Sequence, residues 1–329
     1  MKFVTYLFLE PLNDYDEPRL GLLVDEDVVD LEHASSELGT PLPHDVLAFL
    51  RLGEPAMAAA RKVDVLSKSF TRSFVNSIAR FPKTRTKFLA PVPRPASMRD
   101  AYAFRQHVES ARRNRGLEMI PEFDQFPVFY FTNHQAVIGP GPVEVMPEHL
   151  NRLDYELEAA IVIGKEGRNI KATGADEYIA GYTIMNDWSA RALQMEEMKL
   201  SLGPAKGKDF ATAIGPWLVT RDELAAKRIP SDRGERYDLV MAASLNGKEL
   251  SRGNLKDMTW TFAEIIERAS YGVTLYPGDV IGSGTVGTGC LLELNGSKIT
   301  DNLWVKLGDT VTCSIEALGE LTNTVVASK

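Results

Sequence analysis

The most informative stretch of the chain runs Leu153-Asp154-Tyr155-Glu156-Leu157-Glu158-Ala159-Ala160-Ile161-Val162. Successive side chains of a β-strand point to opposite faces, so a strand here would place Glu156 and Glu158 on one face. Two neighbouring carboxylates repel each other unless a cation lies between them, and hard cations such as Mg²⁺ or Ca²⁺ take oxygen ligands. A solvent-facing acidic strand is the alternative, so a metal site requires further carboxylates that converge on this pair.

Two other acidic residues occupy positions from which they could join the pair. Asp187 lies where an apolar run meets the expected start of a helix at Ser189, although an aspartate there could equally be a helix N-cap. Asp100 and His107 lie in a segment with helical character. A separation of seven residues would bring both side chains to within about 20° on one helix face, roughly 10 Å apart, so Asp100 could bind metal while His107 reaches over a substrate. No pair of His or Cys residues at zinc-type spacing competes with these oxygen ligands.

The composition is that of an ordinary globular protein. Of its 329 residues, 44% are hydrophobic and 25% are charged, which argues against disorder and allows a large domain plus a smaller one. A formal net charge of −8 argues against a nucleic-acid-binding protein, which usually carries a basic excess. Two cysteines, Cys290 and Cys313, cannot supply a disulfide framework, and the N-terminus lacks the features of a signal peptide, so we expect a cytoplasmic location. No apolar stretch approaches the roughly 20 residues that a membrane-spanning helix needs.

Hydrophobic periodicity predicts two domains. Residues 1–35 alternate apolar and polar positions as short strands do, and residues 45–74 have the spacing of two helices broken near Gly53. The proline-rich residues 81–95 are expected to form a stiff linker between a small β-rich N-terminal domain, residues 1–80, and a larger domain, residues 96–329. In the larger domain, helical periodicity is confined to a few segments, chiefly residues 100–115, 189–198 and 261–270. Strands are predicted over residues 159–162, 217–219, 239–245, 280–281, 291–294 and 310–315. We therefore predict an α+β fold that is predominantly β.

Five short motifs follow one another along the chain. They are Asp-x-x-x-x-Arg-Gln-His at 100–107, Leu-Asp-Tyr-Glu-Leu-Glu at 153–158, Met-Asn-Asp-Trp-Ser-Ala-Arg at 185–191, Gly-Lys-Asp-Phe-Ala-Thr at 207–212 and Gly-Ser-Gly-Thr at 282–285. In order and spacing this set resembles the fumarylacetoacetate hydrolase superfamily. The resemblance implies a mixed β-roll or sandwich catalytic domain with peripheral helices, preceded by a small β-rich N-terminal domain and assembled as a homodimer.

The resemblance also implies roles for particular residues. It implies a divalent cation, Mg²⁺ or Ca²⁺ with Mn²⁺ as a further option, held by Asp100, Glu156, Glu158 and Asp187. His107 matches the general base and Glu293 the glutamate that orients it. Lys208 matches the active-site lysine, and Thr212 supports its loop. Further positions match residues that contact substrate or shape its pocket, namely Tyr102, Tyr130, Arg191, Gln194 and Thr285.

The activity implied by the resemblance is hydrolysis of a carbon–carbon bond in a small diketo acid, of the fumarylacetoacetate or acylpyruvate type, in the catabolism of aromatic compounds. His107 would take a proton from water, and Lys208 or Arg191 with Gln194 would stabilise the departing enolate. Met198 stands where family members acting on fumarylacetoacetate itself carry a tyrosine, so the substrate is left open. One alternative is a β-keto acid decarboxylase or keto–enol isomerase with the same site, and another is a non-catalytic, metal-stabilised binding protein. The expected partner is a small molecule, and neither nucleic acid nor a membrane.

Overall fold

The largest element of the computed structural model, which describes residues 1–10, 17–69, 79–114 and 116–328, is a mixed β-sheet. Its strands are β1 Lys2–Phe8, β2 Arg19–Val24, β3 Asp27–Asp30, β4 Arg80–Pro82, β5 Thr86–Phe88, β6 Met98–Ala101, β7 Phe129–Phe131, β8 Val137–Ile138, β11 Leu157–Ile163, β13 Ile179–Asp187, β15 Thr212–Val219 and β21 Val280–Gly282. Hydrogen-bonded neighbours follow the order β4-β3-β2-β1-β15-β13-β11-β21-β6-β7, with β5 beside β1 and β8 beside β15.

A second sheet packs against the first. It has the order β19-β18-β22-β23-β9, with the strands β9 Gly141–Val145, β18 Val240–Leu245, β19 Lys248–Asn254, β22 Thr310–Ile315 and β23 Gly319–Ala327. Leu157 and Ile161 of β11 share one buried apolar cluster with Val311 and Cys313 of β22, so the main core lies between the sheets. Short strand pairs complete the described part of the fold, namely β10 Leu153–Asp154 with β14 Ser189–Ala190, β12 Gly167–Arg168 with β20 Thr274–Leu275, and β16 Arg228–Ile229 with β17 Arg236–Tyr237. The predicted α+β class, predominantly β, is confirmed.

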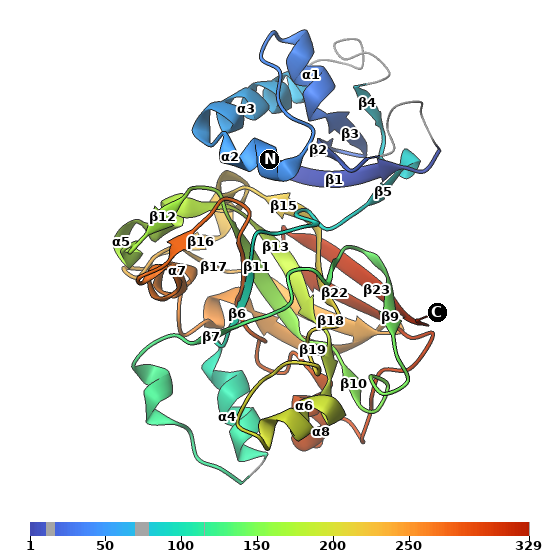
Figure 1. Cartoon of the computed structure of the whole chain (residues 1–329), viewed down its shortest axis with the longest axis vertical. Coiled ribbons are helices and arrows are strands. Elements are labelled where there is room, and N and C mark those ends of the chain that lie inside the picture. Colours follow the sequence, from blue (N-terminus) through green and yellow to red (C-terminus); the bar gives the residue numbers. More distant parts are fainter. Residues whose placement is uncertain (11–16, 70–78, 115, 329) are drawn as a thin grey trace.

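Helices lie at the two ends of the molecule and along one side (Figure 1). They are α1 Leu31–Glu37, α2 Val46–Arg51, α3 Glu54–Ser69, α4 Arg105–Arg113, α5 Ala172–Ala175, α6 Arg191–Met198, α7 Phe262–Ser270 and α8 Leu291–Gly296, with 3₁₀ turns at Lys83–Arg85, Pro121–Asp124, Asp176–Tyr178, Arg221–Lys227 and Leu255–Asp257. The N-terminal helices α1 to α3 cover one end, and α4, α6 and α8 gather at the opposite end. Helix α7 confirms its predicted span, because Thr261 and Glu264 form a reciprocal capping box at its start.

The N-terminal strands continue the large sheet. Strand β1 pairs antiparallel with β15, which places Phe3 opposite Leu218. The predicted linker, residues 81–95, begins in β4 and includes β5, which pair with β3 and β1. The linker prediction was therefore wrong for this part of the segment. Proline is tolerated at the end of an edge strand, where Pro82 lies, so the prolines did not exclude a strand.

One face of strand β11 changes from acidic to apolar along its length. Leu157 and Ala159 face the core between the sheets, whereas Ala160 and Val162, on the opposite face, belong to the cluster that includes the N-terminal residues. Glu158, two residues before Ala160, lies on this second face near the start of the strand. The same face of one strand is therefore apolar beneath the N-terminal unit and acidic at the other end.

Local periodicity assigned three segments wrongly. Asp100 lies on β6, not on a helix with His107, because β6 pairs with β21 and α4 begins only at Arg105. Residues 291–294, predicted as a strand, form the start of α8. Ser189 lies in β14, donates to the Asp187 carbonyl at 3.0 Å and caps no helix. Residues 70–74 and 115 of the predicted helices lie outside the described residues.

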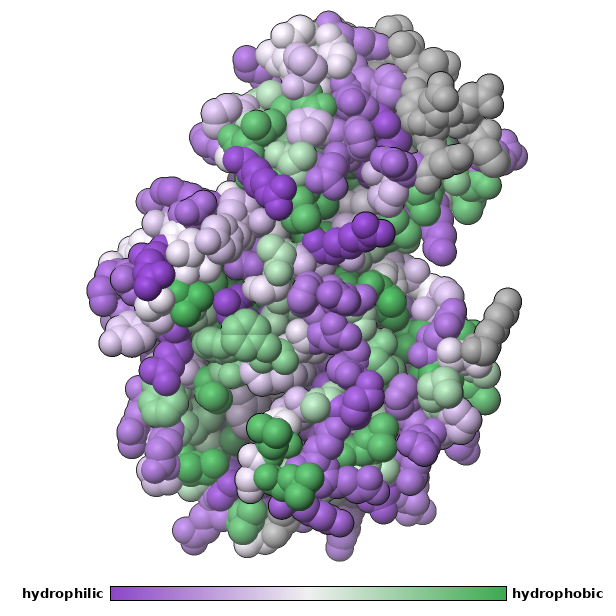
Figure 2. All heavy atoms as spheres, viewed as in Figure 1, coloured by the Kyte–Doolittle hydropathy of each residue, from purple (hydrophilic) through white to green (hydrophobic). Residues whose placement is uncertain are grey.

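The surface in view is mostly hydrophilic (Figure 2). Hydrophobic side chains gather in smaller groups toward the end of the molecule where Figure 1 places α6. Leu200 and Leu202, directly after this helix, are exposed. Over the ranges that the structure describes, no helix combines the length and apolar character needed to cross a membrane.

Candidate metal centre

Four buried carboxylates meet at one end of the large sheet. Asp100 lies on β6 and Glu158 on β11, Asp187 is the last residue of β13, and Glu156 directly precedes β11. Each offers an oxygen within 4.8 Å of an oxygen of the other three. Their exposure ranges from 0% for Glu158 and Asp187 to 6% for Glu156. Four acidic side chains that are distant in sequence therefore share one centre.

Two cations neutralise part of this negative charge. Lys208 Nζ lies 2.5 Å from Glu156 Oε2 and 2.8 Å from Asp187 Oδ2. Arg191 Nη2 donates to Glu156 Oε1 at 2.7 Å. Burial alone would lower the pKa of Lys208, but the charges of Asp187 and Glu156 outweigh it and raise that pKa, so the ammonium stays charged. Both cations therefore form their ion pairs with the cluster at Glu156 and Asp187.

Asp100 and Glu158 form no ion pair with either of these two cations, so the repulsion between their negative charges is not offset. Burial, followed by the charge of Asp187, raises the pKa of Asp100 to about 7. Burial and the charge of Asp100 raise the pKa of Glu158. Burial acts in the same direction on Glu156, but Lys208 and a neighbouring arginine outweigh it and hold the pKa of Glu156 below its ordinary value. A cation between the oxygens would favour the ionised form of every member.

The donor atoms fit a hard divalent cation. Asp187 Oδ2 accepts hydrogen bonds from Tyr130 at 2.6 Å and from Lys208, whereas the buried Oδ1 has no hydrogen-bond partner among the described residues. Leaving a buried polar atom without a partner costs roughly 1–3 kcal/mol, and more when it is charged. The cluster offers oxygen ligands only, which suits Mg²⁺, Ca²⁺ or Mn²⁺. Asp100, Glu156, Glu158 and Asp187 would hold such an ion.

Gly282 of β21 leaves room for two of these carboxylates. A Cβ atom at this position would lie 2.6 Å from Asp100 Oδ1 and 3.0 Å from Glu158 Oε2. We expect Gly282→Ala to displace both side chains and weaken Mg²⁺ binding by about 10–100-fold, the range seen when the supports of metal ligands are lost, as measured by calorimetric titration. Gly174→Ala is the matched control, because a Cβ there meets nothing within 4 Å. Equal affinities in the two variants would contradict the cluster as the binding site.

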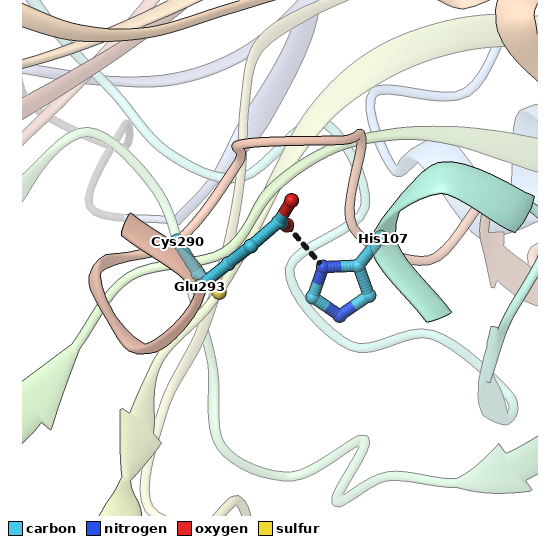
Figure 3. A group of neighbouring side chains, drawn as sticks. All are labelled: His107, Cys290 and Glu293. Atoms are coloured by element: carbon cyan, nitrogen blue, oxygen red, sulfur yellow. Dashed lines mark hydrogen bonds and ion pairs between the residues drawn. The ribbon is translucent and has the colours of Figure 1, made fainter. Parts of the chain in front are cut away.

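A histidine–glutamate pair lies near the carboxylates. His107 on α4 and Glu293 on α8 are both buried, and His107 Nδ1 lies 2.8 Å from Glu293 Oε2. Figure 3 shows the second ring nitrogen on the side of the ring away from Glu293. A carboxylate on one nitrogen fixes the tautomer and the ring orientation, which leaves the other nitrogen to accept a proton. The pair has the arrangement of a positioned general base.

One cavity of about 640 Å³ connects the two groups. Its walls include Asp100, Glu156 and Lys208 from the cluster together with His107 and Glu293. The five predicted substrate positions also line it, namely Tyr102, Tyr130, Arg191, Gln194 and Thr285. A larger hollow of about 920 Å³ lies between α2–α3 and the rest of the chain, but its lining has neither a histidine nor a cysteine. We therefore place the site in the smaller cavity, whose size suits a small organic acid.

Comparisons with known proteins find chains of similar sequence and similar fold. The family model for the fumarylacetoacetate (FAA) hydrolase C-terminal region matches residues 97–326. The chain belongs to the fumarylacetoacetate hydrolase family. It is 31% identical over 319 residues to the mitochondrial oxaloacetate tautomerase Fahd2a of Rattus norvegicus, covering 94% of this chain and 88% of that protein. Two solved structures are similar over 100% of both chains: fumarylacetoacetate hydrolase from psychrophilic Exiguobacterium antarcticum (25% identity, TM-score 0.71) and maleylpyruvate hydrolase from Sphingobium sp. SYK-6 in complex with manganese (II) and pyruvate (20% identity, TM-score 0.69).

Several residues of this fumarylacetoacetate hydrolase family member that were predicted to contact substrate also hold the cluster. Tyr130 donates to Asp187, and the Thr285 hydroxyl lies 3.3 Å from Glu158 Oε1. Arg191 bridges from Glu156 to Gln194, whose Oε1 accepts from Nη1 at 3.0 Å. Thr212, predicted to support the lysine loop, is buried on β15 and pairs with Asp187 across the sheet. Their contacts with a substrate stay predictions.

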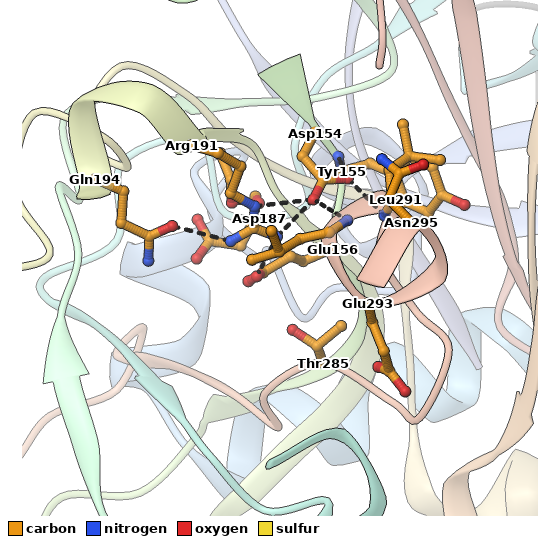
Figure 4. Close-up of polar contacts among 12 residues, drawn as sticks. Asp154, Tyr155, Glu156, Asp187, Arg191, Gln194, Thr285, Leu291, Glu293 and Asn295 are labelled. Carbon is orange, nitrogen blue, oxygen red and sulfur yellow. Dashed lines mark hydrogen bonds and ion pairs between the residues drawn. The ribbon is translucent and has the colours of Figure 1, made fainter. Parts of the chain in front are cut away.

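Asp154, which no sequence pattern predicted to be functional, connects the two halves of this family member's site. Its buried carboxylate accepts from Arg191 Nε at 2.8 Å and from the backbone N–H groups of Leu291 and Leu292 at 2.7 and 2.9 Å (Figure 4). These are the first residues of α8, which carries Glu293. Asp154 lies two residues before Glu156 in the quoted stretch, and that spacing was the only available signal. It ties the base to the metal cluster through Arg191.

Removing this connection is expected to destabilise the fold. Asp154→Ala would leave Arg191 without one partner and the start of α8 without its cap, which should lower the free energy of unfolding by about 3–5 kcal/mol, measured by denaturant titration. Asp238→Ala is the control, because Asp238 forms an exposed pair with Lys256 and its loss should change stability little. A similar change in both variants would show that Asp154 has no special structural role.

Proposed function

We propose that the chain is a divalent-metal-dependent enzyme that interconverts the keto and enol forms of a small 2-oxo diacid such as oxaloacetate. The observation that carries the proposal is that the carboxylate cluster and the His107–Glu293 pair open into one cavity. The name of the rat relative supports the substrate class. The manganese and pyruvate in the similarly folded maleylpyruvate hydrolase support a divalent ion beside a 2-oxo acid.

The chain's own residues would perform the proton transfer. His107 would accept a proton from the carbon next to the carbonyl group and return it to the carbonyl oxygen, while Glu293 stabilises the charged imidazole between the two steps. Lys208 and Arg191 place two cationic groups beside Glu156 in the cavity wall, where they could stabilise developing negative charge. When bound, a divalent cation would polarise the carbonyl group. The proton is moved, not consumed, so no water enters the reaction.

The second candidate is hydrolysis of a carbon–carbon bond in a fumarylacetoacetate-like or acylpyruvate-like acid, which the sequence analysis favoured. The His107–Glu293 pair supports it, because a positioned histidine can also deprotonate water. The two reactions differ in one respect that can be measured. Hydrolysis consumes water and yields two products, whereas tautomerisation returns the same molecule.

Both candidates can be tested in one pair of assays. With Mg²⁺ present, the protein is mixed with freshly dissolved oxaloacetate, and the approach to keto–enol equilibrium is followed by the ultraviolet absorbance of the enol. In parallel, an acylpyruvate in ¹⁸O-water is examined for label in a new carboxylate. We expect faster equilibration of oxaloacetate and no labelled product. Labelled cleavage products without faster equilibration would replace this proposal with the hydrolase.

A further inference from the structure

The sulfur atom of Cys290 lies beside the His107–Glu293 pair. Cys290 is fully buried at the start of α8, next to the residues that lead to Glu293. The Cys290 thiol, the His107 ring and the Glu293 carboxylate each offer a ligand atom within 4.8 Å of the other two (Figure 3). All three line the cavity that also borders the carboxylate cluster. Nothing in the proposed tautomerase reaction uses the thiol.

The three ligand types are those that zinc prefers. Zn²⁺ binds thiolate, imidazole and carboxylate groups, and sites with three protein ligands keep a fourth position open for water. Bonds of about 2.0–2.3 Å in tetrahedral geometry place ligand atoms roughly 3.3–3.8 Å apart, so these atoms need shifts of only about 1 Å. The carboxylate cluster has oxygen ligands alone and favours a harder ion. The cavity thus presents two ion-binding groups of different chemistry.

We propose that His107, Cys290 and Glu293 form a second metal site, for Zn²⁺ or a similar borderline ion, and that its occupation inhibits the enzyme. The inhibition rests on the proposed function, whereas the binding does not. Coordination of one nitrogen of the His107 ring leaves the other nitrogen carrying the proton, so the ring can no longer act as a base. The carboxylate of Glu293 would turn from the ring to the ion.

Protons balance in this step. Burial, followed by the charge of Asp154, raises the pKa of the Cys290 thiol, so the sulfur is protonated without the ion. Coordination converts the thiol to a thiolate and releases one proton to water. No oxidation or reduction takes place. The site differs from a reactive cysteine in that the sulfur acts only as a ligand.

Cobalt is the direct probe, because Co²⁺ bound to a thiolate gives a sulfur-to-metal charge-transfer band and Co²⁺ bound to oxygen alone does not. The protein is first saturated with Mg²⁺ and then titrated with Co²⁺. We expect the band in the wild type and in Glu158→Gln, and its loss in Cys290→Ser. Cys313→Ser is the matched control, because Cys313 is equally buried, lies on β22 and does not line the cavity, so its band should persist. No band in the wild type, or equal bands in the two serine variants, would overturn the site.

The inhibition is measured separately. With Mg²⁺ in excess, the Zn²⁺ concentration that halves tautomerase activity is determined relative to each variant's own activity. We expect it to rise at least tenfold in Cys290→Ser and to stay unchanged in Cys313→Ser. A cobalt band together with undiminished activity in Zn²⁺ would overturn the inhibitory part of the proposal. If the protein shows no tautomerase activity, the proposed function fails, and the cobalt band alone decides the site.

Discussion

Mg²⁺ binding is expected to weaken by more than about 100-fold when Glu158 is replaced by glutamine, because losing a ligand should exceed the 10–100-fold effect of losing a ligand's support. Glu158 is fully buried, and its pKa is raised by burial and by Asp100, so the neutral amide should not unfold the metal-free protein. The change keeps the shape of the side chain and removes one negative charge from the cluster. Calorimetric titration with Mg²⁺ measures the effect directly.

Thermal unfolding gives an independent measure of the same change. An ion that binds only the folded state adds about 2.7 kcal/mol of stability at a concentration 100 times its Kd, so Mg²⁺ should raise the Tm of the wild type and not that of Glu158→Gln. Glu235→Gln is the control, because Glu235 is buried, accepts hydrogen bonds from Arg221 and Tyr237 and does not line the cavity. It should lose stability and keep its Mg²⁺ affinity. Wild-type affinity in Glu158→Gln would remove the basis of the proposed chemistry.

The alternation of Glu156 and Glu158 could be predicted from the sequence because it is a local property of a strand. Both side chains reach the cluster, as the period of two requires. The convergence of Asp100 and Asp187 on this pair came from the order of the motifs and could not be derived from spacing. Strands that are distant in the chain bring them there, and their pairing depends on contacts that a single segment does not encode.

The wrong secondary-structure predictions also arise from contacts between residues that are distant in the chain. The spacing of Asp100 and His107 suits a helix, but the pairing of Asp100 with Gly282 across β6 and β21 places the aspartate on a strand. Leu291 and Leu292 read as strand residues, yet Asp154 from another part of the chain accepts from their backbone N–H groups and begins a helix there. In each case a partner distant in the sequence decided the local structure.

The same partners join the His107–Glu293 pair to the metal ligands at one end of the large sheet. Arg191 contacts Asp154 and Glu156 at once, so the residue that supports the base helix also borders the metal ligands. A change in the carboxylate cluster should therefore alter the position of Glu293, although the described hydrogen bonds join none of the four carboxylates to it directly. Because of this coupling, His107 and the carboxylate ligands must be tested with separate variants, each of which alters either the histidine or the cluster.

His107→Ala is expected to lower the rate of keto–enol conversion by about 10²–10⁴-fold, the usual contribution of a positioned general base, while Mg²⁺ affinity stays at the wild-type value. The ring contributes no oxygen to the carboxylate cluster, so removing it should leave the ion-binding group intact. Glu293→Gln should reduce the rate less, because the amide can still orient the ring but cannot stabilise its charged form. Stopped-flow absorbance of the enol and calorimetric titration measure the two properties on the same samples.

A histidine outside the cavity provides the comparison. His44 belongs to the N-terminal unit, and His44→Ala should change neither the rate nor the Mg²⁺ affinity. If His107→Ala kept the wild-type rate, proton transfer would have to come from another group in the cavity, and Tyr130 or Tyr102 would be the next candidates. If it lost Mg²⁺ affinity as well, the base and the cluster would not be separable, and the rate could not be assigned to proton transfer by His107.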